Sequence, residues 1–263
     1  MVEINKEWDY NVSIKDVQVD DPERQTVRRT KATIDDSTGE MLGLVSPRYT
    51  PIQNKTIHDV MTEIGGDLGL SLQKIDICKN KRLAIFRYTF GDKTKIVENS
   101  TEANDKIRFG FEAINSFDGA LGGGRFRAFA ERLVCTNGMT VPKDVGSISF
   151  RSLGEMESRS LKPILQNRIE PLFNTISTWN KWTQVSPNRS RVGEFINQNF
   201  GKKTTEEMLA QYDSAKDQSL WGLYNLVTFH IIHNLKTRDA SSTRFGQMNA
   251  ERIASKFYTE KLT

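Results

Sequence analysis

Cationic and aromatic side chains alternate along residues 125–132, the part of the chain best suited to binding chemistry. On an extended strand this alternation separates two sides: Arg125, Arg127 and Phe129 on one, and Phe126, Ala128 and Ala130 on the other. Arginines beside a ring, with lysines at a nearby hairpin tip, suit a single strand of nucleic acid, because cations follow phosphates and rings stack on bases. The alternative is that these arginines form surface ion pairs with the glutamates Glu102, Glu112 and Glu131.

Catalytic chemistry finds little support in the sequence. His230 and His233 are three residues apart, a spacing that can chelate a metal on a helix, but no carboxylate or cysteine completes the set nearby. We therefore expect a packed or hydrogen-bonded histidine pair. Asp118 is more simply explained as a turn residue than as part of a magnesium site with Glu112 and Glu131. The sequence predicts a binding protein without a cofactor, and it leaves a metal-dependent nuclease as a weaker alternative.

Composition sets the class of protein. The chain has 263 residues, 37% of them hydrophobic, and a net charge of +4 that is too mild to identify a polyanion partner by itself. It contains no apolar run of roughly 20 residues and no apolar signal-peptide core, so we expect a cytoplasmic protein. In that compartment Cys78 and Cys135 are expected to be reduced, small buried side chains.

Alternating patterns predict the strands that position the arginines. They indicate strands at residues 41–45, 70–77 and 83–90, and a further pair within 107–134 that contains the arginine-rich run. Lys79, Lys81 and Arg82 occupy the turn between the second and third of these strands. A polar loop is expected at residues 91–104, and Arg87 or its alternating neighbours could join the arginine side from the adjacent strand. The pattern favours a four-stranded antiparallel meander over residues 70–134, preceded by a helix over 54–64 with Asn54 as its N-cap and Gly65-Gly66 at its end.

From Met156 onward the apolar spacing becomes helical. We expect a helix that Pro171 kinks or breaks, shorter helices at 191–199 and up to Tyr212, a buried helix at 218–235 and a basic amphipathic helix at 245–258. The predicted fold is α+β, an antiparallel meander packed on helices and followed by a C-terminal helical region. The expected division is a mobile arm at 1–38, a β-rich core at 39–155 and a helical region at 156–263.

Two motifs resemble a phage- and plasmid-encoded family of unknown function. They are Asn-Ser-x-Asp-Gly at residues 115–119 and Arg-x-Val-Cys-x-Asn at 132–137, accompanied by a family-like segment at 44–54 and a looser echo at 221–225. The predicted meander also looks like the core of phage single-strand annealing proteins, which form rings or helical filaments and lay single-stranded DNA in a basic groove. This likeness implies single-stranded DNA and copies of the same chain as partners, without nucleotide hydrolysis.

The same likeness implies roles for particular residues. Phosphates would be held by the cations of the strand and the hairpin turn, namely Arg125, Arg127, Arg132, Lys79, Lys81 and Arg82, with Arg48 beside them. Tyr49 or Phe129 would stack on a base. The competing interpretation is a phage regulatory or anti-defence protein that binds a host protein. A weak salt dependence and a stoichiometric host complex would favour that alternative.

Overall fold

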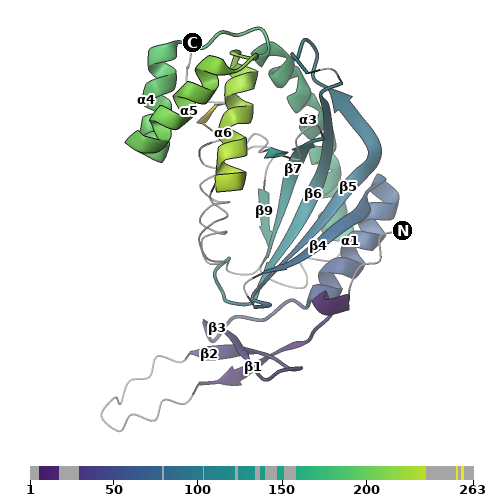
Figure 1. Ribbon diagram of the computed structural model, residues 1–263. Helices are drawn as coiled ribbons and strands as arrows, with labels where there is room; N and C mark the ends of the chain where they lie inside the picture. The colour runs from purple at the N-terminus through teal and green to yellow at the C-terminus, as the bar shows by residue number, and fades with distance from the viewer. Residues whose placement is uncertain are drawn as a thin grey trace. The chain divides into compact units, whose positions relative to one another are not determined.

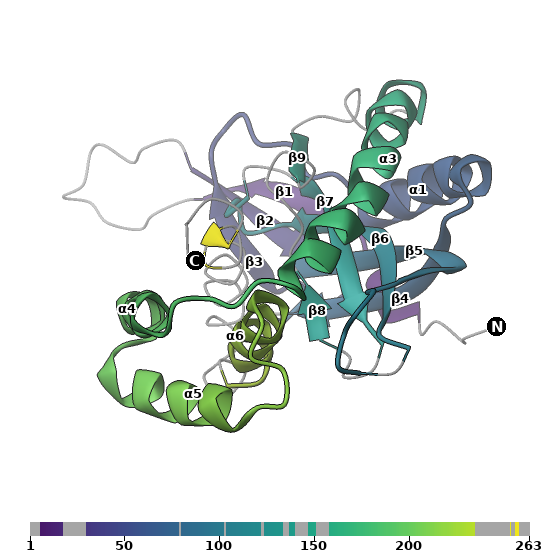
Figure 2. The same cartoon turned by 90° about the horizontal axis from the view of Figure 1, so that it is seen from above.

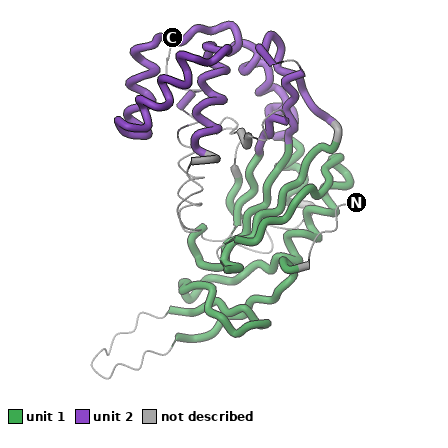
Figure 3. The backbone as a smooth tube through the Cα atoms, viewed as in Figure 1, with its two compact units in different colours: residues 1–91, 110–128, 147–167 green, residues 92–109, 129–146, 168–263 purple. Residues whose placement is uncertain are grey.

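The computed structural model describes residues 6–17, 30–78, 80–102, 104–121, 124–133, 137–139, 147–150 and 158–234, together with Ile253, Lys256 and Phe257. Antiparallel sheets precede a series of helices along the chain (Figure 1), which confirms the predicted α+β class. The chain divides into two compact units (Figure 3). Unit 1 comprises residues 1–91, 110–128 and 147–167, and unit 2 comprises residues 92–109, 129–146 and 168–263.

The smaller sheet belongs to unit 1 and has the order β1-β2-β3. It contains β1 (Val12–Asp16), β2 (Lys31–Asp35) and β3 (Met41–Val45), and the short helix η1 (Lys6–Trp8) precedes it. The predicted strand at 41–45 is confirmed. The strand β1 was not predicted, because its short alternation is surrounded by polar residues. One side of this sheet is covered by a cluster of buried apolar residues: Tyr10, Val12, Leu42 and Phe117.

The larger sheet has the order β4-β5-β6-β7-β8, and β9 also pairs with β7. Its strands are β4 (Ser71–Cys78), β5 (Leu83–Ile96), β6 (Lys106–Ser116), β7 (Gly124–Arg132), β8 (Asn137–Met139) and β9 (Ser147–Phe150). The predicted meander is confirmed, although β5 continues through residues 91–96, where a polar loop was expected. Phe126, Ala128 and Ala130 are buried as predicted.

The helix α1 (Asn54–Leu68) lies beside β4 in unit 1 (Figure 1). It extends through Gly65-Gly66 and ends at Gly69, whose φ of 74° suits a glycine C-cap. The N-cap is Gln53 and not Asn54. Asn54 lies inside the helix because its side chain is buried and hydrogen-bonded elsewhere, to Trp8 and Asn115.

The later helices are α3 (Ser158–Trp182), α4 (Arg189–Phe200), α5 (Lys202–Ser214) and α6 (Leu220–Asn234). Figure 2 shows α4, α5 and α6 as neighbours, all within unit 2. The helix α3 continues through Pro171, so of the two expectations, a kink or a break, the break is wrong. Residues 245–258, predicted as a helix, lie outside the described residues apart from Ile253, Lys256 and Phe257. Within the described ranges, no helix is long and apolar enough to span a bilayer.

Candidate nucleic-acid interface

Glu112 of β6 is a buried carboxylate held by two arginines of neighbouring strands in unit 1. Arg87 of β5 donates from Nε and Nη2 to Glu112 Oε1, at 2.9 and 2.7 Å. Arg127 of β7 donates to the other oxygen, from Nε at 2.9 Å and also from Nη2. The side chain of Glu112 is 2% exposed, whereas those of Arg87 and Arg127 are 29% and 17% exposed. The arginines therefore cover the carboxylate and remain partly open to solvent.

These contacts explain the charge state of Glu112. Burial raises the pKa of its carboxyl group, but the guanidinium groups of Arg127 and Arg87 outweigh burial and hold the pKa below its usual value. Glu112 is thus an anion at neutral pH. The sequence-based alternative of arginine–glutamate pairs is present for Arg127, although the pair is buried and not at the surface.

Arg125 adds a third guanidinium group to this side of the sheet. It precedes Arg127 by two residues on β7, so the two arginines share a strand side, while Phe126 and Ala128 between and after them are buried. Its Nε is buried and has no hydrogen-bond partner among the described residues. Two guanidinium groups thus share Glu112, and Arg125 lies on the same side of β7 as Arg127, so the described residues on this side of the strands carry an excess of positive charge.

The row of charged residues continues across the sheet to β4. Lys74 is paired in register with Arg87, and its Nζ lies 2.7 Å from Asp76 Oδ1. Directly paired residues of antiparallel strands present their side chains on the same face. Lys74 and Asp76 balance each other, so the cation excess comes from the arginines.

An apolar cluster lies beside the arginines. Leu83, Ile85 and Ile114 are buried together, with Cys78 and Leu121 packed against them. Ile85 and Ile114 are two residues away from Arg87 and Glu112, so they share the same sides of β5 and β6. This packing supports the strands that carry the charged groups.

Two predicted segments meet at the end of β6. The Tyr49 hydroxyl donates to Ser116 O at 2.7 Å, and the Phe117 amide donates to Arg82 O at 2.9 Å. Burial, followed by the charge of Asp118, raises the pKa of Tyr49 to about 12. Arg48 and Arg82 are exposed. The structure therefore brings the chain segments of both exposed arginines to the same turn.

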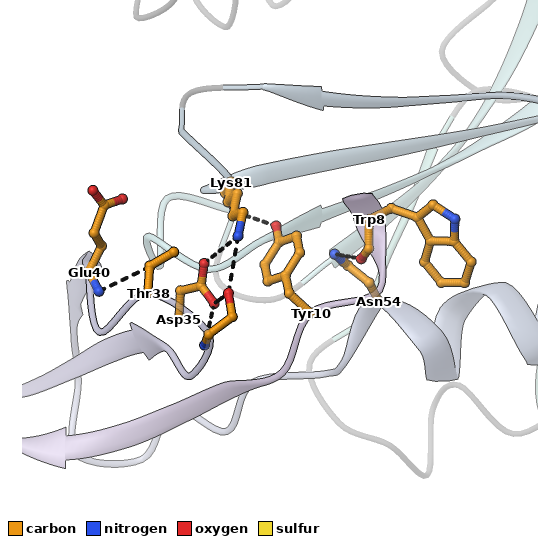
Figure 4. A network of polar contacts seen from close by, with 8 residues as sticks. Trp8, Tyr10, Asp35, Thr38, Glu40, Asn54 and Lys81 are labelled. Atoms are coloured by element: carbon orange, nitrogen blue, oxygen red, sulfur yellow. Dashed lines mark hydrogen bonds and ion pairs between the residues drawn. The ribbon is translucent and has the colours of Figure 1, made fainter. Parts of the chain in front are cut away.

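The charge of Lys81 is matched within unit 1 by Asp35, so Lys81 adds no excess positive charge to the candidate interface. Its Nζ lies 2.6 Å from Asp35 Oδ2 of β2 and 3.3 Å from the Ser37 hydroxyl, and it is 5.0 Å from the centre of the Tyr10 ring (Figure 4). The Tyr10 hydroxyl donates to the Lys81 carbonyl oxygen. Burial raises the pKa of Asp35, but the hydrogen bonds from Lys81 and Ser37 outweigh it and lower that pKa to about 2.

Arg132 belongs to a different cluster, in unit 2. It donates from Nε and Nη2 to the buried Asp105, at 2.6 and 2.8 Å. Trp221 Nε1 and the Ser100 hydroxyl donate to the same carboxylate at 3.1 and 2.7 Å. Because the charge of Arg132 is matched by that of Asp105 in a buried pair, we do not include Arg132 in the candidate interface.

Two other predicted residues, Phe129 and Lys79, are not part of the described interface, for different reasons. Phe129 is 6% exposed, and a ring this deeply buried does not present a face for base stacking. Lys79 lies outside the described residues, as does Cys135. Cys78 is partly buried.

The family-like motifs hold local structure together. Asn115 Nδ2 donates to Ile52 O at 2.8 Å and to Asn54 Oδ1 at 2.9 Å, and Asn54 Nδ2 in turn donates to Trp8 O at 3.0 Å (Figure 4 shows the latter pair). Asp118 Oδ1 accepts from the Ala120 amide at 3.0 Å and from the Ser116 hydroxyl. Asp118 therefore acts as a turn residue, as predicted.

The close approach of two segments also explains a glycine. A Cβ atom on Gly43 would lie 2.4 Å from the Cα of Asp118, which is backbone and cannot move aside easily. Only glycine fits there without a shift of the turn. The segment at 44–54 and the turn at 115–119 are thus packed against each other within unit 1.

The described part of the chain contains no cluster of potential metal ligands. There, no three His, Cys, Asp or Glu side chains come together in a way that could hold an ion. His230 of α6 is buried, its ring lies 5.5 Å from that of Phe200 edge to face, and burial lowers its pKa. The side chain of His233 is outside the described residues.

The residue that sequence reasoning missed is Asp105. It lies at the end of an expected polar loop, and its partners are 27 and 116 residues away along the chain. No local pattern marks such a position. The alternation of charges did indicate that Arg87 could join Arg125 and Arg127.

Comparisons with known proteins give a family but no function. No curated protein and no solved structure matches the chain. A family described as a domain of unknown function, DUF932, matches residues 41–254, which is most of the chain and includes both motifs. The chain therefore belongs to the DUF932 family.

Proposed function

We propose that the protein binds single-stranded nucleic acid, with the guanidinium groups of Arg125, Arg127 and Arg87 on the phosphates. The observation that carries this proposal is the cation excess on this side of the strands, where Arg87 and Arg127 share Glu112 and Arg125 lies beside them on β7 with its Nε unpartnered among the described residues. Charge-assisted hydrogen bonds to an anion would satisfy the unpartnered Nε of Arg125. A phosphate group would add negative charge beside Arg125, whose Nε has no hydrogen-bond partner among the described residues.

Exposed cations at the end of β6 extend this surface. Arg48 and Arg82 are exposed near the turn at 115–119, and the partly exposed Tyr49 stays a candidate for stacking on a base. A strand of nucleic acid bound through its backbone needs several spaced cations and little base recognition. The proposed binding is therefore tolerant of sequence.

The wider role we propose is strand annealing in phage recombination, within the host cytoplasm. Support comes from the antiparallel meander followed by helices, the order of elements on which the sequence-based likeness to annealing proteins rests. In this role the protein works as a homo-oligomer and promotes pairing of complementary strands without a cofactor or nucleotide hydrolysis.

The test is fluorescence anisotropy of a labelled single-stranded oligonucleotide titrated with the protein at several salt concentrations. The wild type is compared with Arg125→Gln. Since the substitution removes one cation, we expect affinity to fall about tenfold at low salt. The slope of log K against log salt should become about 0.7 smaller for a single strand.

Arg189→Gln is the matched control. Arg189 is an exposed arginine on α4, paired with Asp213 at 2.6 Å, and its replacement changes the net charge by the same amount. This variant should bind like the wild type. If both variants lose affinity equally, total charge explains binding and the Arg125 site is rejected. If the folded wild type does not bind at low salt, nucleic-acid binding is rejected, and a host-protein partner becomes the hypothesis to test.

A further inference from the structure

The two edges of the small sheet differ in their side chains. The edge strand β1 carries exposed charged residues, Lys15 and Asp16. The opposite edge strand β3 reads Met-Leu-Gly-Leu-Val and has no charged residue. Edge strands in monomeric proteins are commonly protected by charges, because their unpaired backbone groups can pair with another strand. This protection is present on β1 and absent from β3.

The exposed side chains of β3 are also apolar. Met41 is 52% exposed and Leu44 is 55% exposed, while Leu42 and Val45 of the same strand are buried. Met41 is paired in register with Ile34 of β2, and Leu44 with Ala32. Paired residues share a face, so these side chains form one apolar strip that reaches the edge of the sheet. Such a strip at a strand edge is typical of an interaction surface.

We propose that β3 pairs antiparallel with β3 of a second copy of this chain and forms a two-fold dimer. The same uncharged strand lies on both sides of such a contact, so apolar residues and glycine face each other and no like charges are opposed. A self-complementary patch of this kind is what a two-fold interface requires. The backbone groups at the edge would gain partners, and Met41 and Leu44 would lose contact with water.

The local sequence also limits the assembly. Pro47 follows β3 by two residues and cannot donate to a ladder, so the added pairing ends near Val45. The joined sheet would have the charged β1 strand at each outer edge, which disfavours the addition of a third copy. A two-fold pair therefore closes on itself, and a ring or filament would need a second contact surface. The dimer does not depend on nucleic-acid binding.

The test is sedimentation velocity over a range of protein concentrations, without nucleic acid. We expect the wild type to shift from monomer to dimer as concentration rises. Leu44→Lys introduces a charge of the same sign into the apolar contact from each copy, so the dissociation constant of the dimer should rise roughly tenfold or more. Met41→Lys should also raise the dissociation constant of the dimer. Testing both variants separates an effect of the β3 edge from a folding defect of a single variant.

Ile164→Lys is the matched control, because Ile164 is a similarly exposed apolar residue on α3, at 40%. It should dimerise like the wild type. Circular dichroism and urea unfolding establish that each variant is folded. A wild type that stays monomeric at every concentration overturns the proposal, as do folded Leu44→Lys and Met41→Lys variants that associate like the wild type. Loss of the dimer in all three variants, Ile164→Lys included, also overturns it.

Discussion

Two buried carboxylates, Glu112 in unit 1 and Asp105 in unit 2, are both bound by arginines but differ in their balance of charge. Asp105 has one arginine, Arg132, and its remaining hydrogen bonds come from the neutral groups of Trp221 and Ser100. Glu112 is bound by two arginines, Arg87 and Arg127. Arg125 lies on the same side of β7 as Arg127. Among the described residues, the charges of the Asp105 cluster are matched and the cluster is closed to solvent. The Glu112 cluster retains positive charge and partial exposure.

This difference separates a structural arginine from a candidate binding arginine. In sequence, Arg125, Arg127 and Arg132 all belong to one basic run and received the same predicted role. In the structure, Arg132 binds Asp105 in a one-to-one pair, whereas Arg127 shares Glu112 with Arg87. A buried, matched pair contributes to the fold, while an unmatched cation at the same depth favours an anionic ligand.

The largest effect should follow from Asp105→Asn. The substitution removes the carboxylate that the buried guanidinium group of Arg132 binds, and breaking a buried pair in this way costs about 3 kcal/mol or more. Urea unfolding followed by circular dichroism measures the loss. Without urea and at low temperature, the folded variant should still bind single-stranded DNA normally. Weakened binding by a folded Asp105→Asn variant would mean that the two clusters are not as distinct as their charges indicate.

A smaller effect is expected from Glu112→Gln. Arg87 and Arg127 lose their shared anion, but both are partly exposed and are solvated in part, so the loss of stability should be about 2 kcal/mol. Binding should change in the opposite direction, because removing the carboxylate adds a net positive charge to the proposed phosphate site. The salt-dependent anisotropy assay should show higher affinity and a steeper salt slope. Lower affinity in a folded variant would contradict the proposed role of this surface.

The strands could be predicted more readily than the partners of their charged residues. Alternation in residues 70–90 and 107–131 is a local signal, and β4 to β7 follow it. The pairing of Arg127 with Glu112 links residues 15 apart, and that of Trp221 with Asp105 links residues 116 apart. Local patterns carry no information about such distances. The sequence therefore indicated which residues are cations, but the folded arrangement decides which cations are already neutralised.

Helix ends illustrate the same limit. Asn54 and Gly65-Gly66 have the chemistry of a cap and a stop, yet α1 begins with Asn54 inside it and continues to Leu68. The buried hydrogen bonds of Asn54 with Trp8 and Asn115 override its local preference. Asp118 behaves as predicted because its hydrogen bonds, to Ser116 and Ala120, lie within its own turn.

The dependence of stability on pH should be smaller again and traceable to Glu112. Its pKa is lower in the folded protein than the usual 4.5, so its stabilising contribution is complete above the unfolded pKa and is lost as the pH falls through the folded pKa. The stability difference between the wild type and Glu112→Gln should be constant near neutral pH and should shrink below about pH 4.5. Urea midpoints measured between pH 7 and pH 3 test this. A difference that stays constant down to pH 3 would show that the ion pairs do not carry the effect.

The smallest effect on stability should come from Arg125→Gln, compared with Arg127→Gln on the same strand. Arg127→Gln removes one of the two partners of Glu112 and should cost about 1 kcal/mol or more. Arg125 has a buried Nε without a hydrogen-bond partner in the described part of the chain, so its replacement should change stability by less than about 0.5 kcal/mol. Both variants lose one positive charge, so urea unfolding compares them without a difference in net charge. Equal destabilisation would mean that Arg125 is as structural as Arg127. If Arg125→Gln leaves stability unchanged but weakens nucleic-acid binding, Arg125 acts in ligand binding and not in stabilising the fold.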